Sequence, residues 1–420
     1  MKQTYHPHTT AVHGNIPHPP HSNHALTTPI IQTSTYVFED TADLCAYKEA
    51  QAAGANLPGR HQYGRYGNPT VRAVEERLAT LDQGEDALLF PSGMAAITST
   101  LLSLLSSGDH LIFTDDSYNK TRDFCVDFLP RFGVETTSVP MGDYDAMETA
   151  VKPNTRLILS ESPTNPYIRV LDMERVVSIA KQHGLLTMID STFATPINQR
   201  PLNFGIDLVI HSATKYLGGH NDIMAGVVVG SAELLEPIKQ HRGLLGSITD
   251  PQTAYLLERG LKTLGLRVQQ QNKSAETIAR YLEGHPRVER VWYPALTSHP
   301  DYTIAHAQMD GFGGVVSFEV KVEPVETNSS TSSESVSTSD SRSTAVSAAS
   351  SVMDKFTIAQ NCPSLGGVET LLMQPALAAY YALSPDERAA LGIKDNLIRY
   401  AVGVEDVNDL LADLEQALKK

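Results

Sequence analysis

The sequence predicts an α/β protein with a large, mainly parallel sheet that is covered on both faces, followed by a smaller α+β domain. Short apolar runs, which we interpret as buried strands, alternate with segments of helical spacing, as parallel sheets require. The strand-like runs are 87–90, 111–113, 157–159, 185–189 and 207–210. The helices expected between them are 70–82, 93–106, 119–131 and 172–183.

The C-terminal part of the chain follows a different pattern. A helical stretch at 251–284 leads away from the predicted sheet, and strand-like segments follow at 287–294 and 313–323. The last elements expected are a helix at 352–360, a strand at 396–405 and a helix at 406–420. This mixture of strands and helices is typical of an α+β domain.

We therefore predict an N-terminal arm at 1–62, a large domain at 63–255 that binds the cofactor discussed below, and a C-terminal α+β domain at 256–420. The last domain is interrupted at 325–351, where 12 of 27 residues are Ser and 4 are Thr. A segment of this composition has almost nothing to bury, so we expect a mobile surface loop.

The first two dozen residues carry six of the fifteen histidines. His6 and His8 are spaced closely enough to share a metal ion, but no fixed ligand set accompanies them. We therefore expect an extended arm without a metal site. The chain then becomes strand-like and turn-like at 27–40.

Composition narrows the class of protein further. The chain has 48 acidic and 33 basic side chains and a net charge of −15, which argues against nucleic acid or an anionic membrane as the main partner. It has no run of eighteen apolar residues and no secretory signal at its start. Its three cysteines are far apart and unpaired in sequence, as is usual in a reducing compartment. We expect a cytoplasmic protein that acts on small molecules.

The most informative segment is 207–226, in which an apolar run ends at His211 and leads to Lys215. A lysine at the end of a buried strand is costly to leave charged and unpaired. It is better explained as a reactive amine, whose pKa falls when water is excluded. Another apolar run ends at Asp190, and the carboxyl ends of parallel strands lie at one edge of a sheet.

Lys215, Asp190 and the nearby hydroxyls of Ser212 and Thr214 together match what pyridoxal phosphate needs. The lysine would form the Schiff base, the aspartate would keep the pyridine nitrogen protonated, and the hydroxyls would bind the phosphate. Without Asp190 and the two hydroxyls beside it, a surface lysine at a turn would be the better explanation for Lys215. The combination of groups favours the cofactor.

A serine-nucleophile mechanism is the main rival, because Ser212 and Lys215 also fit the S-x-x-K motif of penicillin-binding proteins and β-lactamases. Those enzymes also carry S-D-N and K-T-G elements, and neither tripeptide occurs in this chain. Their S-x-x-K opens a helix, whereas here it follows a strand-like run. We therefore set this alternative aside.

Nine ordered motifs then point to a known family. They are TxAVHG near residue 10, TPIIQTSTYVF, YGRYGNPT, FPSGMAA, ESPTNP, IDSTFATP, HSATKYLGGHND, SLGGVETL and NLIRYAVGVED. With them the chain resembles the γ-family of pyridoxal-phosphate enzymes of cysteine and methionine metabolism, which have the aspartate-aminotransferase-like fold. Within it, YGRYGNPT, the QPA segment and the sequence around Tyr118 are most similar to plant-type cystathionine γ-synthases. The Ser-rich insertion and the His-rich arm depart from the family pattern.

The resemblance implies roles in cofactor binding. Lys215 matches the Schiff-base lysine, Asp190 the partner of the pyridine nitrogen, and Tyr118 the aromatic that stacks on the pyridoxal ring. The phosphate would be held by four residues, namely Gly93, Met94, Ser212 and Thr214. Gly93 opens a helix after a strand, where free N–H groups and the helix dipole favour an anion.

The resemblance also implies a substrate site, and a cofactor-phosphate site that is shared between neighbouring subunits. Arg399 matches the arginine that binds the substrate α-carboxylate, and Asn165 and Ser364 match residues near it. Tyr63 and Arg65 match residues that reach the cofactor phosphate of a neighbouring subunit, as expected for a homotetramer built from two-fold dimers.

The expected activity is γ-replacement on an activated homoserine ester, in which L-cysteine displaces the γ-substituent and gives cystathionine, a step of transsulfuration and methionine biosynthesis. Lys120 lies two residues beyond Tyr118 and could face the leaving group. The alternatives within the family are cystathionine or methionine γ-lyase, cystathionine β-lyase, and a sulfhydrylase. Methionine γ-lyases typically have a cysteine just beyond the stacking tyrosine, where this chain has Asn119 and Lys120. A remote alternative is a non-catalytic binding protein, but Lys215, Asp190 and Arg399 are all present.

Overall fold

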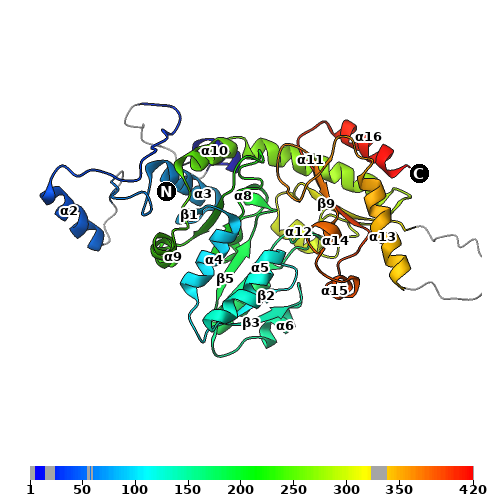
Figure 1. The fold of residues 1–420 in the computed structure, drawn as a ribbon, viewed down its shortest axis with the longest axis horizontal. Coiled ribbons are helices and arrows are strands. Elements are labelled where there is room, and N and C mark those ends of the chain that lie inside the picture. Colours follow the sequence, from blue (N-terminus) through cyan, green and yellow to red (C-terminus); the bar gives the residue numbers. More distant parts are fainter. Residues whose placement is uncertain (1–4, 15–23, 54–56, 58–59, 323–337, 420) are drawn as a thin grey trace, which may run out of the picture.

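The computed structural model describes residues 5–14, 24–53, 57, 60–322 and 338–419. In this part of the chain, a seven-stranded sheet and a five-stranded sheet form two bodies that lie side by side (Figure 1). Helix α11 (Leu264–Glu283) runs along the top of the molecule from the first body to the second (Figure 1). The predicted combination of a large α/β part and a smaller α+β part is confirmed.

The larger sheet has the strand order β1-β7-β6-β5-β4-β2-β3. Its strands are β1 (Asp86–Phe90), β2 (His110–Thr114), β3 (Glu135–Val139), β4 (Thr155–Glu161), β5 (Leu186–Asp190), β6 (Leu208–His211) and β7 (Gly226–Gly230). Only β7 runs antiparallel to its two neighbours. The sequence pattern predicted the five apolar runs but neither β7 nor the polar edge strand β3.

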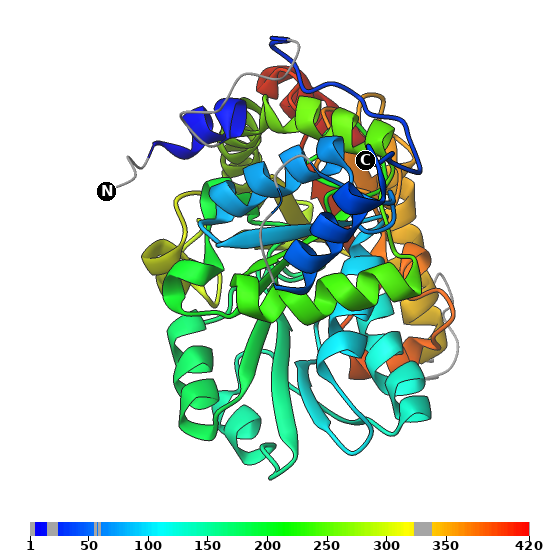
Figure 2. The ribbon, with the colours of Figure 1, turned by 90° about the vertical axis from the view of Figure 1, so that its left-hand side faces the viewer.

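Helices cover both faces of this sheet (Figure 2). One face packs against α4 (Gly93–Leu104), α9 (Ala232–Leu245) and the helical segment that begins with α5 (Asn119–Asp123). The other packs against α6 (Tyr144–Thr149), α7 (Met173–His183) and α3 (Pro69–Asp82). The segment begun by α5 continues as a π-helix at Phe124–Phe128 and a 3₁₀ helix at Leu129–Phe132. Burial on both faces explains why the strands are continuous apolar runs.

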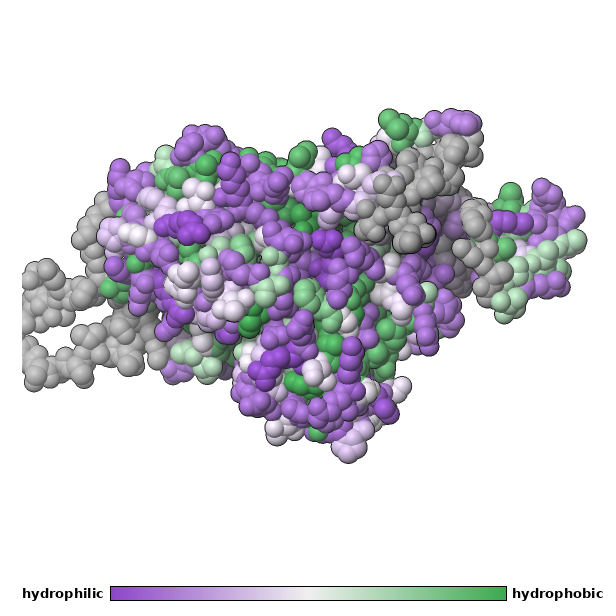
Figure 3. All heavy atoms as spheres, turned by 180° about the vertical axis from the view of Figure 1, so that it is seen from behind, coloured by the Kyte–Doolittle hydropathy of each residue, from purple (hydrophilic) through white to green (hydrophobic). Residues whose placement is uncertain are grey.

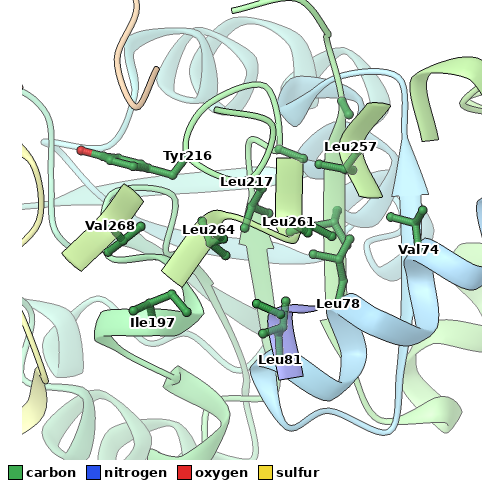
Figure 4. Packing of buried hydrophobic residues seen from close by; sticks show 14 of the residues in the cluster. Val74, Leu78, Leu81, Ile197, Tyr216, Leu217, Leu257, Leu261, Leu264 and Val268 are labelled. Atoms are coloured by element: carbon green, nitrogen blue, oxygen red, sulfur yellow. The ribbon is translucent and has the colours of Figure 1, made fainter. Parts of the chain in front are cut away.

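The predicted helical stretch at 251–284 forms two helices, α10 (Pro251–Leu261) and α11, separated at Lys262 and Thr263. Leu257, Leu261, Leu264 and Val268 from these helices enter one core cluster with α3 (Figure 4). Tyr216 and Leu217, which follow Lys215, belong to the same cluster (Figure 4). The core therefore anchors the chain on the C-terminal side of Lys215.

The smaller sheet has the strand order β10-β11-β12-β9-β8. Its strands are β8 (Val288–Trp292), β9 (Val315–Val320), β10 (Gln360–Asn361), β11 (Leu371–Met373) and β12 (Leu397–Ala401). Its core is covered by α11, α13 (Thr338–Met353) and α16 (Val407–Leu418). The remaining short helices are α8 (Thr195–Asn198), 3₁₀ helix η3 (Pro201–Phe204), α12 (Tyr302–Gln308), α14 (Pro375–Ala378) and α15 (Pro385–Ala390).

Two predictions for the C-terminal part are wrong. The Ser-rich segment 325–351 was expected to be a loop, but residues 338–351 lie in α13, while residues 325–337 are outside the described part. Ala349 and Val352 of α13 are buried in the core, and that packing outweighs the poor helix propensity of serine. The helix expected at 352–360 ends at Met353 instead.

The N-terminal arm also differs from the prediction where it is described. Residues Pro7–His13 form helix α1 rather than an extended segment, and Thr10 and Ala11 are buried. Residues 27–40 contain one isolated bridge, between Thr35 and Tyr63, and no strand. Helix α2 (Thr41–Ala52) stands away from the body (Figures 1 and 3), and of its residues only Tyr47 is buried.

No helix in the described ranges is long and apolar enough to cross a membrane. Figure 3 shows hydrophilic residues over most of the rear face, with apolar residues scattered between them. The domain boundaries predicted at 62 and 255 stay predictions. Helices α1 and α10 both pack on elements of the large body.

Asp413 in α16 provides a test of how the C-terminal core is held. Its carboxylate accepts hydrogen bonds from the backbone N–H groups of Thr357, Ile358 and Ala359, at 2.9–3.1 Å. Burial alone would raise the pKa of Asp413, but these donors outweigh it and hold the pKa below its ordinary value of 3.8. We expect Asp413→Ala to lower the free energy of unfolding by about 2 kcal/mol at pH 7, because three donors lose their acceptor.

A lowered pKa stabilises the folded state above the ordinary value, and this stabilisation disappears as the pH falls through the folded-state pKa. The difference between wild type and Asp413→Ala should therefore be constant down to about pH 5 and shrink below about pH 4. Denaturant unfolding measures it. Asp409→Ala, at an exposed position of the same helix, is the control. An equal loss in the control, or a difference that does not shrink as the pH falls below about 4, would contradict this role.

Candidate active site

The predicted site residues gather where the strands of the large sheet have their carboxyl ends. Glu161 and Asp190 are the last residues of β4 and β5, and His211 is the last residue of β6. Helix α4 begins three residues after β1, at Gly93. Ligands of open α/β sheets bind at this edge.

The turn after β6 is built by its own hydrogen bonds. The Thr214 hydroxyl accepts from Ala225 N–H at 3.0 Å, and Gly219 N–H donates to the Lys215 carbonyl at 2.7 Å. Gly219 has a φ of +73°, and a Cβ there would lie 2.0 Å from Nη1 of Arg267. Arg267 donates to the Tyr216 carbonyl at 2.7 Å. The turn therefore requires a glycine, and a buried arginine secures it.

Lys215 points from this turn toward the C-terminal part of the chain. Its Nζ donates to Ser364 Oγ at 3.1 Å. Burial, and next the positive charge of Arg399, lower the pKa of Lys215 below its usual range. A lysine in such surroundings is more readily available as a free amine. The reactivity of Lys215 stays a prediction.

Asp190 and Ser212 are connected through a residue that the sequence analysis did not single out, Thr192. Its hydroxyl donates to Asp190 Oδ1 at 2.5 Å and accepts from the backbone N–H of Ser212 at 2.8 Å. Burial raises the pKa of Asp190 above its usual range. A cation placed against Asp190 would offset that cost and favour the ionised carboxylate.

Gly93 and Met94 lie in the first turn of α4, where backbone N–H groups have no partner within the helix. Gly93 packs so closely on Ser212 that a Cβ at position 93 would lie 2.8 Å from the Ser212 Cβ. The Met94 sulfur accepts from the Thr121 hydroxyl at 3.8 Å, which brings α5 against this turn. Two N–H groups, the helix dipole and a serine thus adjoin one another.

Arg399 of β12 is buried beside Lys215. Its guanidinium donates to Asn165 Oδ1 at 3.1 Å and to the Ser364 carbonyl at 2.8 Å. Its Nε has no partner, and within the described ranges no carboxylate forms an ion pair with it. Burial lowers the pKa of Arg399 to about 10, so the group stays protonated near pH 7. A buried cation without a counterion is suited to an anionic ligand.

Tyr118 lies just before α5, and 41% of its surface is exposed. Its backbone N–H donates to Glu161 Oε2 at 2.7 Å. Its side chain is therefore available to a ligand. Neither Glu161 nor Thr192 was predicted as a site residue, although they lie in the motifs ESPTNP and IDSTFATP, and each is a polar residue at or just after a strand end.

Three predicted residues make their contacts outside the group around Lys215 and Arg399, namely Tyr63, Arg65 and Lys120. Lys120 donates to Asp123 at 2.7 Å and is exposed, and this hydrogen bond raises the pKa of Lys120. Arg65 donates to the Gly243 carbonyl at 2.7 Å, and its guanidinium lies over the ring of Tyr63. Tyr63 and Arg65 line an open pocket of about 300 Å³ whose lining does not include Lys215.

The described residues fit pyridoxal phosphate. They offer an amine of lowered pKa at Lys215, a buried carboxyl at Asp190, a helix start at Gly93 that packs on a serine, and an uncompensated buried cation at Arg399. The same stretches contain no group of three or more side chains suited to a metal ion. Fold and site together are those of a pyridoxal-phosphate enzyme of the aspartate-aminotransferase-like fold.

Comparison with known proteins agrees with this class. Residues 8–419 match the family described as Cys/Met metabolism PLP-dependent enzyme. Cystathionine gamma-synthase 1, chloroplastic, from Arabidopsis thaliana is 44% identical over 396 residues, which are 94% of this chain and 65% of that protein. L-methionine gamma-lyase from Pseudomonas putida is 39% identical over 98% of this chain and 96% of its own length.

A solved structure agrees as well. Cystathionine gamma-lyase from Lactobacillus plantarum, crystallised in complex with L-serine, superimposes with a TM-score of 0.85 at 36% identity, and the match covers 98% of each chain. The protein belongs to the family of pyridoxal-phosphate-dependent enzymes of cysteine and methionine metabolism. The chain spans about two thirds of the length of its Arabidopsis relative.

The close contact between Gly93 and Ser212 predicts a cofactor defect on substitution. We expect Gly93→Ala to raise the dissociation constant of pyridoxal phosphate about tenfold, equivalent to the loss of roughly one hydrogen bond, because the added methyl group displaces Ser212 or the start of α4. Equilibrating the holoenzyme against graded cofactor and recording the retained absorbance measures it. Gly284→Ala is the control, since its Cβ would meet only one atom, at 3.8 Å. Unchanged affinity in Gly93→Ala would contradict the assignment.

Proposed function

We propose that the protein catalyses γ-replacement on an activated homoserine ester with L-cysteine and produces cystathionine. The observation that carries this proposal is the 44% identity to a cystathionine gamma-synthase over 94% of the chain, together with a site in which Lys215 and Arg399 meet at Ser364. The bound cofactor would supply an acceptor for the electrons released when the substrate loses its Cα proton.

The proposed roles of the chain's own residues follow from their surroundings. Lys215 would bind the cofactor at rest and then move protons at the substrate Cα and Cβ, for which an amine of lowered pKa is suited. Asp190 would keep the pyridine nitrogen protonated, and Tyr118 would cover the ring. The phosphate would be bound by the N–H groups of the α4 start and by two hydroxyls, namely Gly93, Met94, Ser212 and Thr214.

Substrate binding would centre on Arg399. Its planar guanidinium can bind the two oxygens of an α-carboxylate, and its present partners, Asn165 and the Ser364 carbonyl, are neutral. Ser364 also accepts from Lys215, so it would place the amine next to the carboxylate site. We further propose that Lys120 leaves Asp123 and pairs with a charged leaving group.

A γ-lyase is the second candidate, because L-methionine gamma-lyase is 39% identical over 98% of the chain. The residue after Tyr118 argues against it. Asn119 donates to the Ala379 carbonyl at 3.1 Å and so ties α5 to the segment after α14. Methionine γ-lyases are expected to carry a cysteine just beyond this tyrosine, and neither Asn119 nor Lys120 is a cysteine.

We also propose a homotetramer of two-fold dimers in which Tyr63 and Arg65 complete the partner's phosphate site. Two observations support a partner at this surface. The pocket of Tyr63 and Arg65 adjoins a second one of about 590 Å³ through Ile248, and Met224 in that second pocket is 70% exposed. A cytoplasmic location stays part of the proposal and is supported by three free cysteines.

The activity is tested by offering purified protein O-phospho-, O-succinyl- and O-acetylhomoserine, each with cysteine or sulfide, and identifying the products. We expect cystathionine from cysteine with at least one ester, and no product from Lys215→Ala. If Lys120 binds the leaving group, Lys120→Ala should lose at least about tenfold in kcat/KM for a charged ester but not for O-acetylhomoserine. Release of α-keto acid from cystathionine or methionine, without synthesis, would instead indicate a lyase.

The shared site is tested with two defective variants, Arg65→Ala and Lys215→Ala, unfolded together and refolded as an equal mixture. Half of the dimers are then mixed, and each mixed dimer has one site with both residues intact. We expect about a quarter of the wild-type activity, as two-fold reciprocity requires. If subunit exchange is demonstrated and the mixture shows only the summed activity of the two variants, Arg65 serves its own chain.

A further inference from the structure

Glu161 is a buried carboxyl that none of the roles above uses. It ends β4, and only 5% of its surface is exposed. Its Oε2 accepts the backbone N–H of Tyr118 at 2.7 Å, and the backbone N–H of Asn165 is a further donor to the same carboxyl. One side chain therefore joins the backbones of the residue beside the proposed ring site and of the residue that contacts Arg399.

Glu161 also has a carboxyl neighbour. It pairs in register with Asp190 on the adjacent parallel strand, so the two side chains point to the same side of the sheet. Two buried carboxyls that are direct neighbours on adjacent strands do not both ionise readily. Burial, and next the charge of Asp190, raise the pKa of Glu161 well above its usual range. If Asp190 carries the charge, Glu161 is the one that stays neutral.

This contact ties the start of α5 to the large sheet. Tyr118 is the residue before the helix, and its side chain makes no capping hydrogen bond. Its ring is partly exposed, so packing alone leaves it free to turn. The bond to Glu161 is made across 43 residues of sequence and ties the helix start to the sheet.

We propose that Glu161 is a positioning residue that holds Tyr118 over the cofactor site through the acceptor oxygen of a neutral carboxyl. It acts through Tyr118 and is not itself a catalytic residue. The inference rests on the proposed stacking role of Tyr118, and it adds a residue that orients that ring.

The test compares Glu161→Gln with Glu161→Ala and Glu161→Met. Glutamine resembles a neutral carboxyl and keeps an acceptor oxygen, alanine removes the side chain, and methionine keeps its length without a comparable acceptor. The dissociation constant of pyridoxal phosphate is measured by equilibrating each holoenzyme against graded cofactor. We expect Ala and Met to raise it about tenfold and Gln to stay within about threefold of wild type.

Tyr118 provides the second measurement. If Glu161 acts through Tyr118, then Tyr118→Ala combined with Glu161→Ala should bind the cofactor no more weakly than Tyr118→Ala alone. Asp207→Ala is the matched control, because Asp207 accepts the Thr187 N–H at 2.8 Å at the opposite end of β5. It should lower the melting temperature and leave cofactor affinity unchanged.

Three results would overturn the proposal: Gln as weak as Ala and Met, wild-type affinity in both Ala and Met, or additive losses in the double variant. If Glu161→Ala does not fold, the comparison of Met with Gln decides. All of these readings are cofactor affinities. They stay valid if no cystathionine is formed, so failure of the proposed activity and failure of this inference are distinguishable.

Discussion

The arrangement of the site depends on two basic side chains that donate hydrogen bonds to one serine. Lys215 follows β6 of the large sheet, Arg399 belongs to β12 of the small sheet, and both donate to Ser364. Burial, and next the repulsion from the positive charge of Arg399, disfavour the charged form of Lys215 and lower its pKa. The packing of α10 and α11 against α3 and the Lys215 turn is what holds these parts in place against the repulsion (Figure 4).

Sequence reasoning found the parts of the site that local patterns encode. Asp190 and Lys215 follow continuous apolar runs, and Gly93 opens a helix directly after a strand, so their positions could be predicted from periodicity and the strand-end rule. The roles of Lys215 and Asp190 were inferred from their chemistry, whereas those of Gly93 and Arg399 came from the family motifs. Local patterns could not predict contacts between distant segments, such as that of Arg399 with Asn165 at a separation of 234 residues, which only the family resemblance brought together. No local signal distinguishes Glu161 or Thr192 from other polar residues at strand ends.

The errors have the same physical origin. Helix α13 forms in a Ser-rich segment because Ala349 and Val352 find a core to pack against, and composition does not reveal that partner. Strand β7 was missed because its apolar part is only three valines between two glycines. Those glycines are needed, since a Cβ on Gly226 would lie 2.1 Å from the Ser92 carbonyl oxygen, next to the start of α4. In both segments, tertiary contacts override local propensity.

The charges around the site are divided between two sides. Carboxyls stand at the ends of β4 and β5, and just after β2, where burial raises the pKa of Asp116 to about 7. The basic side chains of Lys215 and Arg399 and the N–H groups of α4 belong to other segments. A ligand with a protonated ring nitrogen and anionic groups can satisfy both sides at once, whereas an apolar ligand would satisfy neither. The site therefore has basic groups on one side and carboxyls on the other, an arrangement that suits a phosphorylated ring with a basic nitrogen.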